Sequence, residues 1–254
     1  MPFPAKFKAG LMVSALSLIA ATAVTATGPI ETAVSAPERP TSETQWDGKR
    51  HPIAVLDFMG LKPGMTVWDH GSGRGYYTAI MSRTVGPDGK VYAHNSNRFW
   101  PNIKDTVEPR HKALGNVETF VGNITDFDGH AGEFDMIFIG LLFHHLHYSP
   151  ETGNGMPESS KAYWAKAMEM LKPGGVIAIV EHQAPDGTPR AESAAWHRTS
   201  LQDAITDLTA AGFEYVGSSD ALANPDDPQN IPFRDLATGR YSSQRFVAKF
   251  RKPS

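Results

Sequence analysis

The sequence of 254 residues contains no cysteine. This absence excludes disulfide bonds, metal sites built on thiolates and a lipid attached through a thioether. The charges nearly cancel, with a formal net charge of −3, and no basic stretch is interleaved with aromatic residues. The chain therefore lacks the electrostatic footprint of a nucleic-acid-binding protein, and we expect no nucleic-acid partner. The H-E-x-x-H pattern of zinc peptidases is also absent.

The N-terminal segment differs in composition from the rest of the chain. Two lysines precede an apolar run at residues 11–26 that carries no charge, and small residues at 21–23 and 24–26 provide cleavage sites. We predict a signal peptide over residues 1–26, a periplasmic or secreted mature protein, and no stable membrane span after removal of the signal. An uncleaved membrane anchor is the alternative interpretation, although the run is short for a span.

The remaining chain divides into two parts. Residues 27–50 are polar and contain Pro37 and Pro40, which is typical of a linker. Residues 51–254 are long enough for one domain with its own hydrophobic core.

Strand and helix patterns alternate along this expected domain. The apolar and alternating runs predict strands at residues 66–68, 90–94, 117–121, 134–139, 176–180, 213–216 and 244–250. Helices are expected at 53–59 and 76–85, within 103–113, at about 159–171, and within 200–211. Such alternation predicts a mostly parallel sheet with helices on both faces, which is a Rossmann-like, doubly wound α/β fold.

The most informative segment follows the first expected strand. Residues 67–75 read VWDHGSGRG, so that Asp69 precedes three glycines spaced two apart. Glycine permits a tight turn and lets a ligand approach the backbone closely. The helix expected next would direct its free N–H groups toward the same place. Because the spacing differs from the G-x-G-x-x-G of dinucleotide-binding folds, the segment predicts a different nucleotide-like ligand.

With four further segments, this turn resembles the class I S-adenosylmethionine-dependent methyltransferases. The segments are LKPGMTV at 61–67, GKVYAHN at 89–95, FDMI at 134–137 and LKPGGV at 171–176. The resemblance implies a seven-stranded sheet with an antiparallel last strand, S-adenosylmethionine as cofactor, and methyl transfer to a small molecule. The whole chain is most similar to a group of predicted exported methyltransferases. It lacks the Asn-Pro-Pro-Tyr motif that the family uses on nucleobase or amide nitrogens.

The resemblance also implies a set of cofactor contacts. The methionine part would be held by Asp69, Gly71, Gly73 and Gly75, the ribose by Asn95, and the adenine by Asn123 or Asp126. The family usually has acids at the positions of Asn95 and Asn123. Replacing these charged hydrogen bonds by neutral ones would weaken binding by about 1–3 kcal/mol.

Histidines follow several of the expected strands. They are His70, His94, His144, His145, His147 and His182. Because ligands bind beyond the carboxyl ends of parallel strands, these imidazoles should surround one crevice. An imidazole accepts a proton from a hydroxyl or amine nucleophile, so we take His144, His145 and His182 as candidate catalytic bases. For each of them the alternative is a packing role or a hydrogen bond to the backbone.

A metal site is a second interpretation of the same residues. His144 and His147 are three apart, on one face if helical, and with His182 or Asp69 they would provide nitrogen and oxygen ligands for zinc or copper. We assign no metal here. The matching alternative function is a non-catalytic exported module that binds another ligand or a metal.

Overall fold

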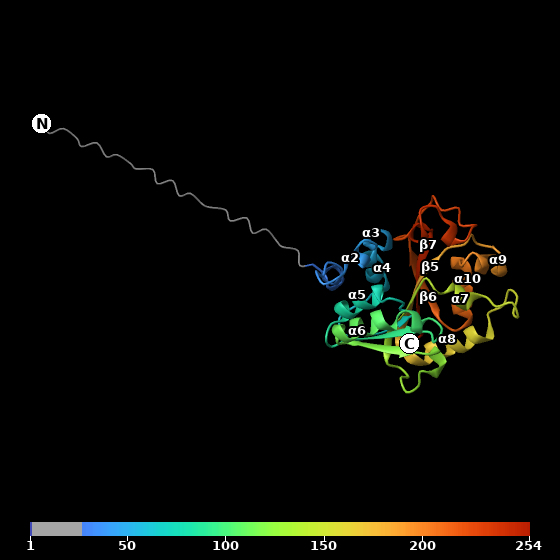
Figure 1. Ribbon diagram of the computed structural model, residues 1–254, viewed down its shortest axis with the longest axis horizontal. Helices are drawn as coiled ribbons and strands as arrows, with labels where there is room; N and C mark the ends of the chain where they lie inside the picture. Colours follow the sequence, from blue (N-terminus) through green and yellow to red (C-terminus); the bar gives the residue numbers. More distant parts are fainter. Residues whose placement is uncertain (2–26) are drawn as a thin grey trace.

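Seven strands form one sheet in the computed structural model of this protein, which describes residue 1 and residues 27–254 (Figure 1). The predicted signal peptide therefore lies almost wholly outside the described residues. The strands are β1 (Thr66–His70), β2 (Lys90–Asn95), β3 (Val117–Val121), β4 (Phe134–Gly140), β5 (Leu171–His182), β6 (Glu214–Ser219) and β7 (Arg245–Arg251).

The order of the strands is β3-β2-β1-β4-β5-β7-β6. The first five strands in this order run parallel, whereas β7 runs antiparallel to both β5 and β6. The α/β, Rossmann-like fold with an antiparallel last strand is thus confirmed. Strand β5 is longer than the expected 176–180, because its pairing continues to Leu171 beside β4 and to His182 beside β7.

Helices cover both faces of the sheet (Figure 1). The α-helices are α1 (Pro29–Val34), α2 (Thr41–Thr44), α3 (Asp47–Arg50), α4 (Pro52–Met59), α5 (Tyr76–Val85), α6 (Lys104–Leu114), α7 (His144–His147), α8 (Glu158–Met170), α9 (Arg190–Ala195) and α10 (Leu201–Ala210). Short 3-10 turns are η1 (Trp100–Asn102), η2 (Ile124–Asp126), η3 (Phe233–Asp235) and η4 (Arg240–Ser242).

Successive side chains along each strand point to opposite faces of the sheet, so two separate hydrophobic cores form, one on each face. In β1, Val67 packs with α1, α4 and α5, while Trp68 on the other face packs with α8 and α10. In β4, Met136 and Ile137 divide between the two cores in the same way. This period-two pattern with both faces buried is the physical reason that the central strands read as continuous apolar runs.

The segment expected as a linker is folded. Residues 27–50 form α1, α2 and α3, and Ile30 and Ala33 are buried in the core beside α4 and α5. Arg39 donates two hydrogen bonds of 2.7 Å to the Asp47 carboxylate and one to the carbonyl of Val34. Sequence patterns missed this segment because its helices are short and its charges are satisfied only by tertiary contacts. Within the described part of the chain, no helix is long and apolar enough to cross a membrane.

Replacing Arg39 by Ala tests whether residues 27–50 belong to the folded domain. The Arg39 side chain is fully buried and that of Asp47 is 24% exposed, so we expect the free energy of unfolding to fall by about 2–3 kcal/mol. Lys161→Ala is the matched control, because Lys161 pairs with Glu158 at the exposed surface and its loss should cost about 0.5 kcal/mol or less. Equal denaturation midpoints for the two variants in urea would restore the linker interpretation.

Candidate active site

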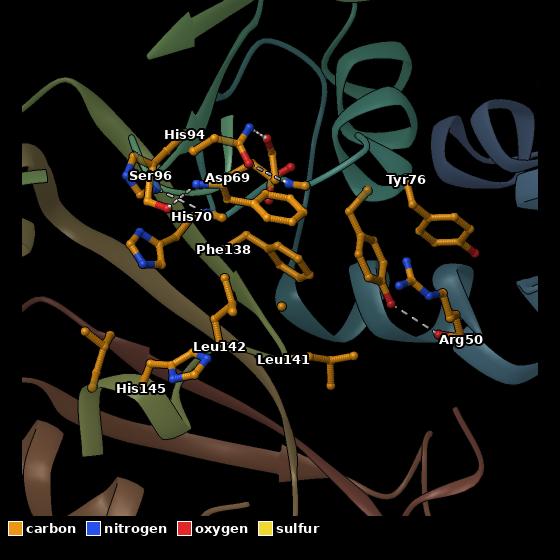
Figure 2. A pocket seen from close by; sticks show the side chains of 18 residues that line it. Arg50, Asp69, His70, Tyr76, His94, Ser96, Phe138, Leu141, Leu142 and His145 are labelled. Carbon is orange, nitrogen blue, oxygen red and sulfur yellow. Dashed lines mark hydrogen bonds between the residues drawn. The ribbon is translucent and has the colours of Figure 1, made fainter. Parts of the chain in front are cut away.

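A cavity of about 490 Å³ opens beyond the carboxyl ends of β1, β2 and β4 (Figure 2). This volume lies in the range of small-molecule binding sites. Its lining comes from four parts of the chain: Arg50; Asp69, His70, Gly71, Ser72, Gly73, Tyr76 and Tyr77; His94, Asn95, Ser96 and Phe99; and Phe138, Gly140, Leu141, Leu142, His145 and Leu146. The sheet edge predicted from the histidines and the glycine turn is therefore the edge that carries the cavity.

The turn after β1 is held by side chains from the end of β2. The N–H of Gly71 donates to His94 Nδ1 at 3.2 Å, and His94 Nε2 lies 3.0 Å from the carbonyl oxygen of Gly122. Because a carbonyl only accepts and an amide N–H only donates, the proton of His94 is assigned to Nε2. Burial lowers the pKa of His94, which favours this neutral form. His94 is thus a structural bridge rather than a base.

Asn95 serves the same turn. Its side-chain oxygen accepts the N–H of Gly73 at 3.1 Å, and its amide donates to the Ser72 hydroxyl at 2.7 Å. Asn95 also lines the cavity, and its amide retains a second lone pair and a second N–H, so its predicted contact with ribose stays a prediction. The N–H groups of Gly71, Ser72 and Gly73 are likewise bonded within the protein, so the turn does not offer these three to a ligand. The free N–H groups that we predicted are those at the start of α5.

Each of the three positions in the turn needs glycine for a different reason. Gly71 has φ +64°, and a Cβ there would overlap the Leu142 side chain. Gly73 has φ +57° and also lines the cavity. Gly75, with φ +82°, starts α5 in the left-handed conformation and lies beside Arg110 and His111, outside the cavity lining. Two of the three therefore reach the ligand space, and the third shapes the start of the helix.

Asp69 places an uncompensated carboxylate in the cavity wall. The residue is 3% exposed, and one of its oxygens accepts a hydrogen bond of 2.6 Å from the Thr78 hydroxyl. Burial raises the pKa of Asp69 to about 7, against the smaller lowering effects of Thr78 and Arg50. A cationic ligand group would restore the solvation that this carboxylate has lost.

Arg50 supplies the opposite charge, and sequence reasoning missed it. Its guanidinium lies 4.1 Å from the Tyr76 ring centre and 4.4 Å from that of Tyr241, and it donates to the Tyr241 hydroxyl at 2.6 Å. The Tyr77 hydroxyl donates to the Arg50 carbonyl at 3.3 Å. No local pattern marks Arg50, because only the folding of α3 onto α5 brings it to the cavity.

The residues expected at the adenine lie elsewhere. Asn123 and Asp126 are exposed, hydrogen-bond each other at 3.2 Å and are not in the lining of the cavity. Ser96 and Phe99, which follow β2, line the cavity instead. Phe99 is 46% exposed, which is unusual for an aromatic ring and leaves one face open to a planar ligand.

The wall contributed by the end of β4 contains strained backbone. Leu141 has φ +61°, a left-handed conformation that is rare for a branched side chain, and its N–H donates to the Val180 carbonyl at 2.7 Å. The strain directs Leu141 and Leu142 into the cavity, where Figure 2 shows them between the Arg50 end and the His145 end. Strain of this kind is concentrated at ligand sites.

The structure separates the three histidines predicted as bases. His145 lines the cavity, and burial followed by its neighbours His144 and His197 lowers its pKa to about 4. His144 is buried behind it and lies 3.1 Å from the Glu181 carboxylate. His182 is fully buried, with Nδ1 2.6 Å from the Ser243 hydroxyl and its ring stacked on Phe233, so it does not reach the cavity.

The fold does not bring together the metal ligands predicted from the sequence, which were His144 and His147 with His182 or Asp69. His147 is fully buried between Asp203 and Asp207, at 3.7 and 3.6 Å. Neither His147 nor His182 belongs to a group of potential ligands with His144 among the described residues. Within residues 27–254, such a group consists instead of His144, His145 and His197.

Comparison with known proteins places this site in a family. Residues 61–217, more than half of the chain, match the family described as "Methyltransferase domain". The chain belongs to this family. The match covers the sheet from β1 into β6 and every segment that lines the cavity except Arg50.

Among curated proteins, this chain is similar to the protein-L-isoaspartate O-methyltransferase of Ignicoccus hospitalis, with 28% identity over 53% of this chain and 56% of the relative. It is also similar to the demethylmenaquinone methyltransferase of Staphylococcus carnosus, with 26% identity over 52% of this chain and 48% of the relative. The chain thus spans about half the length of these relatives.

Solved structures share the fold. A SAM-dependent methyltransferase from Aquifex aeolicus superposes with a TM-score of 0.58 at 21% identity, over 83% of this chain and 94% of that one. The 1,6-didemethyltoxoflavin-N1-methyltransferase of Burkholderia thailandensis, solved with S-adenosylhomocysteine, gives a TM-score of 0.52 at 21% identity, over 84% and 80%.

The cofactor of this methyltransferase family is S-adenosylmethionine, and the cavity fits it. The cofactor carries an ammonium and a carboxylate on one end and a planar base on the other. The buried Asp69 carboxylate and the Arg50 guanidinium match the first end, and the open face of Phe99 with Ser96 suits the second. The donor set of the cavity therefore agrees with a zwitterionic nucleoside.

The raised pKa of Asp69 predicts a stability difference that grows with pH. The carboxyl has a pKa of about 7 when folded and 3.8 when unfolded, so the folded protein binds more protons and this group lowers stability as pH rises from 4 to 7. Asp69→Asn removes this ionisable group. We expect the difference in free energy of unfolding between the variant and the parent to rise by up to about 4 kcal/mol from pH 4 to pH 8.

Chemical denaturation across this pH range measures the gain. Asp126→Asn is the control, because its carboxylate is exposed and lies outside the cavity lining. A flat difference for Asp69→Asn would show that the carboxyl is solvated.

Proposed function

We propose that this protein transfers a methyl group from S-adenosylmethionine to a small-molecule acceptor. The observation that carries the proposal is one cavity lined by the buried Asp69 carboxylate, the Arg50 guanidinium and the His145 imidazole, with Arg50 and His145 on opposite sides of it (Figure 2). The bound cofactor supplies an electrophilic methyl group on a sulfonium centre. The residues of the chain then have to orient it, exclude water and handle the proton of the acceptor.

Two ion pairs orient the amino-acid end of the cofactor. Asp69 accepts from the ammonium group, and its pKa falls from about 7 toward the ordinary carboxylate range as this pair forms. Arg50 donates to the carboxylate, held in place by its contacts with Tyr76 and Tyr241. Opposite charges at two fixed points define the direction of the ligand in the cavity, which a single ion pair would not do.

Apolar side chains separate this end from the acceptor. Leu141, Leu142 and Leu146 line the cavity between Arg50 and His145, and Phe138 lies against Tyr77 at 4.7 Å between ring centres. A dry wall of this kind strengthens the ion pairs and keeps water away from the reacting carbon. It also favours an acceptor with an apolar body.

His145 is the predicted base that reaches the acceptor. Its lowered pKa of about 4 keeps it unprotonated at neutral pH and makes it a weak base, so it orients the hydroxyl or amine of the acceptor by accepting its hydrogen bond. His144 supports it from behind, with the two ring centres 4.2 Å apart. We propose His144 as a positioning residue and give His182 no part in the reaction, since it is buried against Phe233.

The limited cavity favours a small acceptor. A volume of about 490 Å³ must hold the cofactor and the reacting part of the acceptor. One curated relative is named for demethylmenaquinone, which is consistent with a small acceptor.

A non-catalytic module that binds another ligand is the second candidate. The observation in its favour is that Asn95 is engaged by the glycine turn and that Asn123 lies outside the cavity lining. Binding of the cofactor distinguishes the two candidates.

Calorimetry of the full chain with S-adenosylmethionine tests the proposal. We expect one site per chain, and an affinity that decreases below pH 7, because protonation of Asp69 competes with the ammonium group. Arg50→Met should weaken binding about 10–100-fold through the lost charged hydrogen bonds. Arg74→Met is the matched control, since Arg74 is exposed, follows the same turn and does not line the cavity.

Absence of binding to the parent, together with no transfer of labelled methyl groups to a small-molecule extract, would favour the second candidate. Equal losses in Arg50→Met and Arg74→Met would reject the assigned orientation of the cofactor.

We also propose that the protein is exported to the periplasm or secreted. The support is the sequence of residues 1–26, with two lysines before an uncharged apolar run. We expect the protein recovered from the envelope fraction to begin after Ala23 or Ala26, as read by N-terminal sequencing. A chain that begins at Met1 and is recovered with the cytoplasmic fraction would contradict export.

A further inference from the structure

We propose that His144, His145 and His197 form a binding site for a divalent zinc-class metal ion at the acceptor end of the cavity. One ring nitrogen from each histidine lies within 4.8 Å of the others. His144 and His145 begin α7, directly after β4, whereas His197 follows α9 more than fifty residues later. Only the fold brings the third histidine to the first two.

The rings already converge. The centre of the His197 ring lies 5.2 Å from that of His144 and 5.7 Å from that of His145, nearly perpendicular to both. Tetrahedral zinc with bonds of about 2.0–2.1 Å holds its ligand nitrogens roughly 3.3 Å apart. Rotations of the exposed His145 and half-buried His197 side chains would bring the ring nitrogens from within 4.8 Å of one another to this spacing.

Glu181 provides the outer support that metal-binding histidines usually have. Its carboxylate is fully buried at the end of β5 and lies 3.1 Å from His144 Nδ1. The same carboxylate accepts the backbone N–H of His144 at 3.0 Å and that of His182 at 2.6 Å. A carboxylate beside Nδ1 favours the proton on that nitrogen and leaves the lone pair on Nε2 for an ion.

His197 is held in a costly conformation. Its φ of +54° is in the left-handed region, which a residue without glycine's freedom rarely adopts. Its Nδ1 atom is shielded from solvent and has no hydrogen-bond partner in the described part of the chain. Strain together with an unsatisfied polar atom is typical of a residue kept in place for a ligand.

Arg234 contacts the three-histidine group through His197. Its guanidinium donates to His197 Nε2 at 3.3 Å from the exposed surface. This positive charge beside His197 repels a metal ion, so Arg234 opposes metal binding. Its removal is therefore a variant that should strengthen the site.

Three imidazoles leave a fourth position open, as in catalytic zinc sites. Because His145 also lines the cavity, an acceptor oxygen can take that position. This role rests on the proposed methyl transfer. In the metal-loaded protein, the acceptor hydroxyl coordinates the ion and releases its proton to solvent. The oxygen then forms the O–CH₃ bond as the sulfonium S–CH₃ bond breaks, with S-adenosylhomocysteine as the other product. His145 is a ligand in this form and not the base.

The experiment titrates the full chain, stripped with chelator, with Zn²⁺ and with Co²⁺, whose visible spectrum reports tetrahedral nitrogen ligands. We expect one ion per chain. His197→Ala and His145→Ala should each lower affinity at least about 100-fold, and Glu181→Gln about 10–100-fold. Arg234→Met should raise it. His130→Ala is the control, because His130 pairs with Glu133 away from the cavity and its loss should leave affinity unchanged.

Thermal unfolding checks that each variant folds, and His197→Ala, which alters a half-buried residue, keeps the test valid if Glu181→Gln does not fold. Binding of Zn²⁺ with the same affinity in the parent and in His197→Ala would overturn the proposal, as would a Co²⁺ spectrum of octahedral coordination. Calorimetry with S-adenosylmethionine on the metal-free protein is independent of this site, so failure of the metal site and failure of the proposed function are separable.

Discussion

The geometry of the active site depends on two side chains from the end of β2 that hold the turn after β1. His94 and Asn95 accept the N–H groups of Gly71 and Gly73, and His94 extends the link to Gly122 after β3. Three neighbouring strands are thereby tied together at their carboxyl ends. Because the N–H groups of Gly71, Ser72 and Gly73 are bonded within the protein, these three residues hold the cavity wall beside Asp69.

Two charged side chains, Asp69 and Arg50, line the cavity beside this turn. Asp69 lies in the sheet, and Arg50 arrives from a segment before the sheet that packs on α5 through Ile30, Ala33 and the buried Arg39. The helices of residues 29–50 are therefore part of the binding site and not an attachment to it. Burial of Asp69 has a cost in stability, which a cationic group bound beside it would offset.

The histidines near this edge of the sheet differ in role although they look alike in sequence. His94 and His182 are enclosed and bonded to Gly122 and Ser243, His147 lies between two aspartates, and His145 faces the cavity. Burial and partners, not residue type, separate structural imidazoles from those able to act on an acceptor or a metal ion.

Sequence alone determined the strands and most helices of this protein, because apolar periodicity and glycine turns are local properties that survive in any tertiary setting. It also identified Asp69 and the sheet edge, since a strand, an acid and a glycine turn are contiguous. Tertiary structure decided the rest. Arg50 and His197 reach the site through packing of distant segments, and Asn123 and Asp126 lie outside the cavity lining. Residues 27–50 fold because Arg39 pairs with Asp47 within the segment and Glu43 pairs with the distant Arg110. These outcomes depend on through-space contacts, which no local pattern encodes.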